Sequence, residues 1–490
     1  MYCDLDPDGA RLPIKIDTTS NGEHFPVPLT PDQHCANKFA HERVSELARK
    51  LGLSRRQFLK SSAGAAATLL AFNEAHAQRG HTGGFFDIPA EAALDVELAQ
   101  ATVGGNEFIF DIQNHVVDPN AGWKSTLNGR RWQLVLENNF VQAAKCAPGS
   151  LDCYSSVQFI KDVFLDADTS ASVVSALWGP PDGNPTPIDY AVEVRELVNA
   201  LGDGRRGLVH GGVMPNLPGA FDYMESLLQY DIAAWKLYPQ WGENGFGYYM
   251  DDEETGVPFI ERVRELDGPK IICAHRGLPL PFLAYEYSHP RDIASAAKMF
   301  PDVTFICYHS GFEPGKTEGP YDPNQDEGVN RFIKAHEDQG FRRNEGNLYA
   351  ELGGVWNAYR GIPDQAAHVI GKLLQYFGED RICWGTDTVW HGSPQDQIQA
   401  MRTFQISEEF QETYGYPAIT PEIKAKIFGL NSARVYGLSP DDVRRAAQTD
   451  SVATYKANYR NDPNPGFESY GPKTRREFLN FLSMNGGRPG

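Results

Sequence analysis

The chain has 490 residues, of which 41% are hydrophobic, and a formal net charge of -19. This length and hydrophobic content can bury one large core or two ordinary ones. The acidic balance argues against nucleic acid or an anionic membrane surface as a partner, because both are bound through basic patches. No apolar run in the sequence reaches the roughly 20 residues that a membrane-spanning helix needs, so stable membrane insertion is not expected.

A segment near the N-terminus resembles an export signal. Ser54–Lys60, with the sequence Ser-Arg-Arg-Gln-Phe-Leu-Lys, resembles the twin-arginine motif, and a small-residue apolar stretch follows at 61–72. Ala75-His76-Ala77 has the form of a signal-peptidase site. We therefore expect a mature chain beginning near Gln78 in the periplasm or outside the cell, and a cytoplasmic protein if the signal is not used. The alternative is a basic turn before an ordinary Ala-rich helix.

Five regions are predicted along the chain. The leader is polar, rich in Pro, Asp and His, and without a sustained apolar period, so disorder is expected there. In order, the regions are the disordered leader (1–53), the twin-arginine signal segment (54–77), a linker (78–106), a barrel domain (107–440) and a C-terminal extension (441–490).

From residue 107 onward, short apolar runs alternate with helical periodicity, which is typical of repeated βα units. The predicted strands are Phe108–His115, Ser172–Trp178, Gly207–Met214, Ile232–Tyr238, Lys270–His275, Val303–His309, Leu348–Leu352 and Arg381–Asp387. Predicted helices between them include Asp189–Leu201, Phe221–Tyr230, Phe259–Leu266, Val329–Gln339 and Asp364–Phe377. Eight such units predict a (β/α)₈ TIM barrel of the α/β class. An open doubly wound sheet is the alternative, but Gln113-Asn114-His115 does not resemble its Gly-rich phosphate turn.

Four of the predicted strands end in metal-capable side chains: His115, His275, His309 and Asp387. In a barrel those strand ends converge on one cavity, and a divalent cation prefers such nitrogen and oxygen ligands. We therefore predict a metal site at the mouth. The alternative is that each His merely ends its strand and binds a backbone group.

The cysteines are not spaced as a secreted disulfide framework. Strand alternation places Cys273, Cys307 and Cys383 on the same faces as the strand-end ligands, one layer deeper in the barrel. Core packing is the favoured interpretation for these three thiols. Cys146 and Cys153 flank a short loop and could form a disulfide in an oxidising compartment.

The order of these residues resembles the amidohydrolase superfamily. The Gln113-Asn114-His115 segment resembles its His-x-His motif, and His275, His309 and Gly385-Thr386-Asp387 match the later strands. Gly429–Leu438 resembles the terminal helix of the amidohydrolase-related family, which includes aminocarboxymuconate semialdehyde and γ-resorcylate decarboxylases. The resemblance covers about residues 107–440.

The resemblance implies one divalent metal ion, Zn before Mn or Mg, held by Gln113, His115, His275 and Asp387. It implies His309 and Asp387 as the catalytic acid/base groups. Gln113 departs from the family, which usually has His there, and a neutral amide oxygen is a weaker ligand.

Other residues are expected around the substrate. Lys236 ends the fourth strand, where other branches carry a carboxylated lysine between two metals; here we expect it to pair with Glu351 or with a substrate anion. Arg276 is expected either to bind a substrate carboxylate or to form a salt bridge at the rim. Three aromatic residues are expected to stack on a ring: Trp241, Phe312 and Trp390.

The predicted function is metal-assisted hydrolysis of a small cyclic or aromatic amide, ester or lactone by a metal-activated water. The alternative at the same metal is non-oxidative decarboxylation of an aromatic or unsaturated acid. A third interpretation is an inactive barrel that binds a ligand, in which Gln113 marks a lost site. The expected partner is a small molecule, and a homodimer or larger homo-oligomer is expected.

Overall fold

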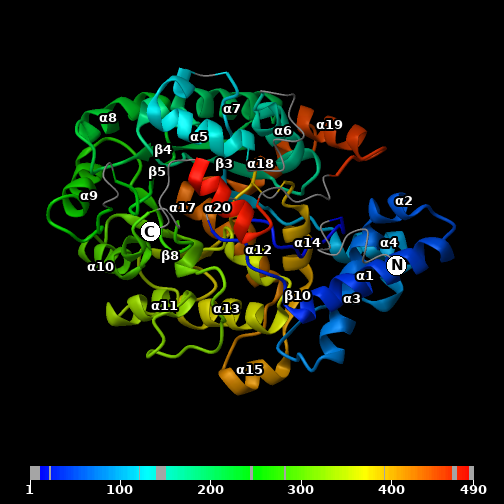
Figure 1. The fold of residues 1–490 in the computed structure, drawn as a ribbon. Coiled ribbons are helices and arrows are strands. Elements are labelled where there is room, and N and C mark those ends of the chain that lie inside the picture. Colours follow the sequence, from blue (N-terminus) through cyan, green and yellow to red (C-terminus); the bar gives the residue numbers. More distant parts are fainter. Residues whose placement is uncertain are drawn as a thin grey trace.

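Eight parallel strands follow one another around a barrel in sequence order (Figure 1). The computed structural model describes residues 11–20, 24–120, 122–138, 150–202, 204–242, 247–280, 283–390, 392–465 and 472–484. The barrel strands are β2 (Phe110–Asn114), β3 (Ala171–Val174), β4 (Gly207–Val213), β5 (Ala234–Leu237), β6 (Ile271–His275), β7 (Thr304–Tyr308), β8 (Leu348–Glu351) and β9 (Ile382–Cys383). Each of them lies within one of the predicted strands or begins one residue before it, so the predicted eight strands are confirmed.

The last strand region returns to the first. The Ile112 backbone N–H donates to the Trp384 carbonyl at 3.1 Å, and the Asp387 N–H donates to the Gln113 carbonyl at 2.9 Å. These bonds close the sheet, which satisfies the backbone groups that an open sheet would leave at its edges. The (β/α)₈ barrel is therefore the fold, and the doubly wound alternative is wrong.

Helices follow the strands where apolar residues recur at helical spacing. Those around the barrel are α5 (Leu127–Asn138), α6 (Ser156–Ile160), α7 (Ile188–Leu201), α8 (Ala220–Leu227), α9 (Gly256–Glu265), α10 (Arg291–Met299), α11 (Val329–Asp338), α12 (Val355–Tyr359), α13 (Pro363–Tyr376), α14 (Gln395–Thr403), α15 (Glu408–Tyr414), α16 (Pro421–Ala425) and α17 (Asn431–Tyr436). The five helices predicted from periodicity match α7, α8, α9, α11 and α13 to within a few residues.

The thiols divide between two cores, which corrects one prediction. Cys273 and Cys383 belong to the cluster inside the barrel, with Ile306 and Tyr308 of β7. Cys307 instead packs in the outer core between the strands and the helices. Its predicted direction was wrong because β7 ends at Tyr308, and His309 leaves the strand with φ +66°, so alternation does not carry from Cys307 to His309. Cys153 is disulfide-bonded, while Cys146 lies outside the described residues.

The leader is not disordered in the residues that the structure describes, contrary to prediction. Residues 31–50 form helix α1 (Pro31–Lys50), which starts with a capping box between Thr30 and Gln33. The apolar segment of the export signal is helix α3 (Ser62–Gln78), preceded by the short α2 (Arg55–Leu59). The sequence did not predict α1 because many of the residues that this helix buries are small, such as Ala36 and Ala40, and give only a weak apolar period.

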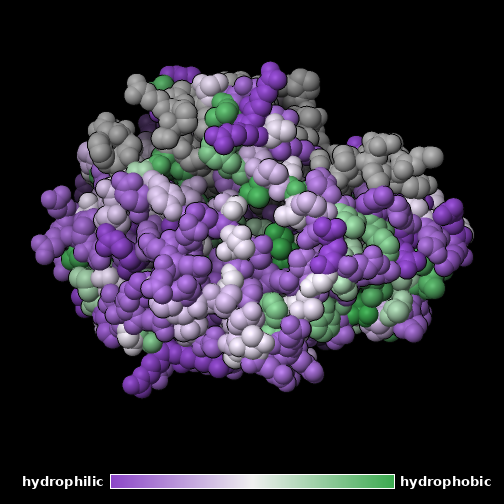
Figure 2. All heavy atoms as spheres, turned by 60° about the horizontal axis from the view of Figure 1, so that its bottom comes forward, coloured by the Kyte–Doolittle hydropathy of each residue, from purple (hydrophilic) through white to green (hydrophobic). Residues whose placement is uncertain are grey.

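The region expected to be a linker also packs against its neighbours. Helix α4 (Val96–Val103) buries Ala99 and Val103, and strand β1 (Gly84–Phe86) pairs antiparallel with β10 (Phe404–Ile406). The N-terminal helices therefore lie beside the barrel rather than apart from it (Figure 1). In Figure 2 hydrophobic side chains gather on the side of these helices and around a hollow near the centre of the face.

The C-terminal extension is helical. It contains α18 (Pro440–Ala446), α19 (Ser451–Tyr459) and α20 (Arg475–Met484). The α20 residue Phe478 is fully buried, with its ring centroid 4.7 Å from that of Phe25 in the leader. Phe478 belongs to the same hydrophobic cluster as Trp390 and Phe25, so the C-terminal extension packs against residues of the leader and of the barrel. Within the described part of the chain, no helix is both long and apolar enough to cross a membrane.

Candidate active site at the mouth of the barrel

Five buried side chains that were predicted as metal or acid/base residues converge at the mouth: Gln113, His115, His275, His309 and Asp387. His275 Nδ1 lies 3.2 Å from His309 Nε2, and His115 Nε2 lies 3.2 Å from Asp387 Oδ1. Gln113 Nε2 joins the two pairs, at 3.3 Å from both His309 Nε2 and Asp387 Oδ1. The barrel thus brings together the whole predicted set of metal and acid/base residues.

Backbone carbonyls fix each imidazole ring. His115 Nδ1 is 2.9 Å from the Ser175 carbonyl, His275 Nε2 is 3.0 Å from the Leu278 carbonyl, and His309 Nδ1 is 2.7 Å from the Gly353 carbonyl. A carbonyl oxygen only accepts, so each of these ring nitrogens carries the proton. The other nitrogen of each ring faces the cluster. These carbonyls have no side-chain signature, and sequence reasoning missed them.

The two facing imidazoles are neutral. Burial, reinforced by the nearby Lys236 charge, lowers the pKa of His275 to about 3. Burial, together with the neighbouring His275 and Lys236, also lowers the pKa of His309 well below its ordinary value. Two lone pairs therefore face each other across 3.2 Å. Such an arrangement is repulsive unless an electrophile lies between them or beside them.

Backbone strain is concentrated at this site. Six non-glycine residues of the described chain have positive φ, and four of them are Leu278, His309, Ser310 and Asp387. A non-glycine residue in the left-handed region costs about 1 kcal/mol or more, so it persists where surrounding contacts enforce it. Here the strain turns His309 and Asp387 out of their strand directions and toward the cluster.

Glu351, at the end of β8, supports the site from behind. Its carboxylate accepts the His309 N–H at 3.0 Å and the Gly353 N–H at 2.5 Å. Burial raises the pKa of Glu351, and these two N–H groups and the Lys236 charge oppose that rise. Lys236 itself lies with Nζ 3.8 Å from the centre of the Tyr308 ring. The direct pairing of Lys236 with Glu351 stays a prediction.

A further carboxylate lies on the first barrel strand. Asp111 accepts the Thr386 N–H at 3.1 Å, accepts the Thr386 hydroxyl, and accepts the Gln113 N–H at 3.2 Å. Burial raises the pKa of Asp111 to about 7 despite these donors. Asp111 therefore ties the backbone beside Gln113 to the backbone beside Asp387. The alternation of β2 could have indicated it, but its partner Thr386 is distant in sequence.

The predicted substrate residues differ in their surroundings. Trp390 stacks on His115 with ring centroids 5.6 Å apart, and Phe312 lines a cavity beside the cluster. Trp241 packs with Tyr238, whose ring stacks on His275 at 5.1 Å. Arg276 forms a fully buried ion pair with Asp292, which is the salt-bridge alternative expected for it.

The donor set suits a divalent cation. Imidazole nitrogens and a carboxylate are ligands for zinc-like ions, and Gln113 Oε1 is buried without a hydrogen-bond partner among the described residues. Amide oxygen and nitrogen are exchanged by a half-turn of the side chain, which would aim Oε1 at the cluster. Within the described part of the chain, however, no three His, Cys, Asp or Glu side chains form a ready-made coordination sphere.

Comparison with known proteins identifies the family. A family model described as amidohydrolase matches residues 183–438, about half of the chain. The chain belongs to the amidohydrolase family. Its members are generally metal-dependent enzymes, both hydrolases and decarboxylases. The matched part of this amidohydrolase contains His275, His309 and Asp387, but it leaves out strand β2 with Gln113 and His115.

Solved structures with similar folds share little sequence with this amidohydrolase. An uncharacterised TIM-barrel protein from Bordetella bronchiseptica is 16% identical, with a TM-score of 0.41, covering 67% of this chain and 98% of its own. A Burkholderia multivorans amidohydrolase with bound zinc is 15% identical, with a TM-score of 0.40, covering 68% and 100%. A 5-carboxyvanillate decarboxylase from Sphingomonas paucimobilis is 11% identical, with a TM-score of 0.40, covering 68% and 100%. No curated protein matches the sequence.

A second family model, the twin-arginine translocation signal, matches residues 52–71. This part of the amidohydrolase contains the arginine pair and the first half of helix α3. The structure gives Arg55 specific partners in α1: its guanidinium donates to the His41 carbonyl at 3.0 Å and to Ser45 Oγ at 2.6 Å. The signal is therefore present in the sequence, and in the fold it is packed against the leader.

Proposed function

We propose that this chain is a metal-dependent hydrolase of small cyclic or aromatic amides, esters or lactones. The observation that carries the proposal is the contact between His275 Nδ1 and His309 Nε2, two nitrogens whose partner nitrogens already donate to carbonyls. A cation beside them turns this repulsive contact into coordination. We propose Gln113, His115, His275 and Asp387 as its ligands, with zinc favoured by the nitrogen donors and Mn or Mg as alternatives.

A divalent cation in such a site supplies Lewis-acid chemistry and lowers the pKa of water toward about 7. Side chains of the protein then transfer the protons. Asp387 takes the proton of the attacking water and passes it to the unprotonated Nε2 of His309, which then delivers it to the leaving group. The Glu351 carboxylate holds the His309 backbone N–H, which keeps the ring in place during proton transfer.

Hydrolysis is favoured over decarboxylation by the state of Arg276. A decarboxylase must bind a substrate carboxylate, and Arg276, like Lys236, was a candidate cation for binding it. In the structure Arg276 is fully buried and neutralised by Asp292, so its charge is not directed at a substrate. A neutral amide, ester or lactone needs no such cation.

The purified full-length chain should be assayed with a panel of aryl esters, lactones and cyclic amides, and with hydroxybenzoates for release of CO₂. Chelation should abolish turnover, and Zn or Mn should restore it. Release of CO₂ from hydroxybenzoates without hydrolysis would replace our proposal by the decarboxylase alternative. Persistent absence of metal and of both activities would support a binding protein.

We also propose that the enzyme uses the twin-arginine route to the periplasm. The support is the signal match over residues 52–71. That route transports folded proteins. The Cys273 and Cys383 thiols would therefore be buried, and the metal bound, before export. Fractionation of the producing cells, with detection of the full-length chain, tests this assignment.

A further inference from the structure

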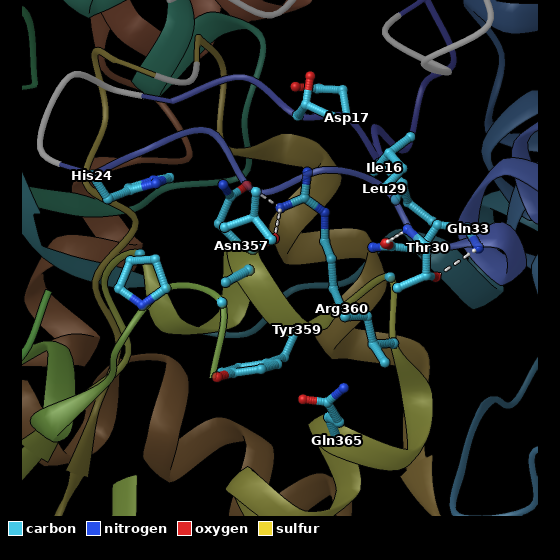
Figure 3. Close-up of a pocket in the computed structure, with 18 of the residues that line it drawn as sticks. Ile16, Asp17, His24, Leu29, Thr30, Gln33, Asn357, Tyr359, Arg360 and Gln365 are labelled. Atoms are coloured by element: carbon cyan, nitrogen blue, oxygen red, sulfur yellow. Dashed lines mark hydrogen bonds between the residues drawn. The ribbon is translucent and has the colours of Figure 1, made fainter. Parts of the chain in front are cut away.

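A cavity of about 220 Å³ lies between the leader and the loops of the barrel (Figure 3). Its leader wall includes Ile16, Leu29 and Gln33, and its barrel wall includes Phe312 and Tyr359. The Phe312 and Tyr359 rings meet edge to face at 5.3 Å. Sites for small molecules are concave and largely apolar, with a few placed polar groups, and these walls have that composition.

Two buried polar atoms of the cavity wall have no hydrogen-bond partner among the residues that the structure describes. They are Thr19 Oγ1 and Arg360 Nε, in side chains that belong to residues only 9% and 5% exposed. In Figure 3 the Arg360 side chain lies between Asn357 and the leader residues Leu29 and Thr30. Both atoms can donate, and a buried donor without an acceptor is unfavourable. An occupant that carries an acceptor oxygen would therefore be stabilised in this cavity.

The charges of the wall favour an uncharged occupant. The charged side chains that line the cavity are Lys15, Asp17, Lys316 and Arg360. Arg360 pairs with Asp396 at 2.9 Å, and Lys316 pairs with Glu327 at 2.5 Å. Lys15 and Asp17 add one charge of each sign. The wall thus has no excess charge of either sign to compensate an ion.

The cavity is separated from the candidate catalytic groups by backbone, and that backbone holds two of the imidazole rings. Leu278 and Gly354 line the cavity. The Leu278 carbonyl accepts the N–H of His275 Nε2 at 3.0 Å, and the carbonyl of Gly353, next to Gly354, accepts the N–H of His309 Nδ1 at 2.7 Å. An occupant would therefore contact this backbone from the side opposite the histidine cluster, where it is not a substrate.

The Phe312 backbone joins the two segments that hold these rings. The Leu278 N–H donates to the Phe312 carbonyl at 2.5 Å, and the Phe312 N–H donates to the His309 carbonyl at 2.8 Å. Leu278 and His309 have φ +43° and +66°, conformations that surrounding contacts must enforce. A ligand packed against the Phe312 ring would change those contacts and, with them, the orientation of both imidazoles.

We propose that this cavity is a second ligand site of the full-length chain, for a small uncharged ring that carries a carbonyl oxygen. Its occupant is coupled to the orientation of His275 and His309. An effect on turnover rests on the proposed function, whereas the binding site and the coupling do not. The site belongs to the full-length chain because Thr19 and Leu29 precede the expected peptidase site.

Acetophenone is the probe for this site, because it is a ring with a carbonyl oxygen and has no bond that a hydrolase cleaves. Calorimetry with the full-length chain, treated with a chelator, should show saturable binding. Ethylbenzene lacks the oxygen and benzoate is charged, so both should bind about tenfold more weakly, as expected for a lost buried hydrogen bond or an uncompensated charge. Equal binding of the three, or no saturable binding of acetophenone, would overturn the site and leave the hydrolase proposal untouched.

Variants of the wall locate the probe. Thr19→Val removes the hydroxyl with little change of shape and should weaken acetophenone binding by about tenfold. Ala358→Leu adds carbons that fill the cavity from α12 and should abolish binding. Thr169→Val is the matched control, because Thr169 Oγ1 is also buried without a partner among the described residues but does not line the cavity. Unchanged affinity in Thr19→Val and Ala358→Leu would contradict the assignment.

The coupling is tested by NMR of the histidine rings in the chelator-treated chain. Acetophenone should shift the ring resonances of His275 and His309, with the dissociation constant that calorimetry gives, and Ala358→Leu should remove both shifts. Binding without these shifts would refute the coupling. A chain that shows binding and shifts but hydrolyses nothing in the panel would refute the hydrolase proposal and support the second site.

Discussion

His275 Nδ1 and His309 Nε2 lie 3.2 Å apart, although each ring donates its only proton to a carbonyl on the other side. One of these two residues ends β6, and the other follows β7 with φ +66°. This contact joins a proposed metal ligand, His275, to a proposed acid/base group, His309. The sequence alone placed the two residues on separate strands. The predictions below separate these roles from one another.

Removing a ligand should empty the site, whereas removing the acid/base group should not. His275→Ala and Asp387→Ala should each lose the metal, because few protein ligands remain. His309→Ala should keep most of it and lose about 10²–10⁴-fold in turnover, the usual range for a positioned proton-transfer group. Metal content per chain checks this, with His368→Ala as a buried histidine outside the cluster for control. About two metals in the wild type, reduced in both His309→Ala and Lys236→Ala, would indicate a binuclear site instead.

Gln113→His should raise metal affinity. The Gln113 amide lies 3.3 Å from both His309 Nε2 and Asp387 Oδ1, so an imidazole there would add a stronger donor. Competition with a chromophoric chelator measures the change. Gln113→Asn, which keeps the amide, should give no gain, and equal affinity of Gln113→His and wild type would show that this position does not face the metal.

Gly385→Ala should destabilise the fold by about 1–3 kcal/mol. A Cβ at Gly385 would overlap Glu351 Oε1, and that carboxylate is held by the His309 and Gly353 N–H groups and cannot move freely. Urea unfolding measures the loss. Gly319→Ala is the control, because a Cβ there meets nothing within 4 Å. Equal stability of the two variants would mean that Glu351 relaxes without cost.

The contact of the leader with the barrel should weaken as the pH rises. Burial opposes the charge on His81, but the hydrogen bonds to Asp32 and Asp364 outweigh it and raise the pKa of His81. A raised pKa means that this stabilisation is complete below the unfolded value of about 6.5 and is lost as the pH rises through the folded value. The groups facing His81 also include His76 and Arg79, which pairs with Asp32.

The measurement for this contact is the free energy of unfolding in urea of the wild type minus that of His81→Gln, between about pH 5 and pH 9. The difference should be on the order of 1 kcal/mol or less at the acidic end, because His81 is partly exposed, and should fall toward zero at the basic end. A difference that grows with pH would contradict the sign of the shift.

Replacing Arg55 and Arg56 by Lys should keep the protein in the cytoplasm if the signal is used. The effect is expected because Lys lacks the planar fork of donors that Arg presents. Cell fractionation measures it. Arg475 and Arg476, a second arginine pair in α20, provide the control, since Lys at those positions should leave localisation unchanged. Unaltered export of the Arg55 and Arg56 variant would remove the targeting role.

The sequence by itself determined the barrel and most of the candidate site. Local alternation of short apolar runs and helical periods is enough to locate strands such as Ile271–His275, and parallel strands in a barrel bring their ends to one mouth. That rule alone placed His275, His309 and Asp387 together, and the chain's own hydrophobic pattern supplied the register.

Only the tertiary structure decided how these ends are used. The direction of Cys307 and His309 depends on a left-handed turn, and the fate of Arg276 depends on Asp292, which reaches it from the following helix. The leader's burial depends on α1 meeting α3 and on His81 meeting Asp364, which is 283 residues away. Contacts between distant segments leave no period in the local sequence. The polar leader and the export signal therefore gave no indication that their helices pack into the fold.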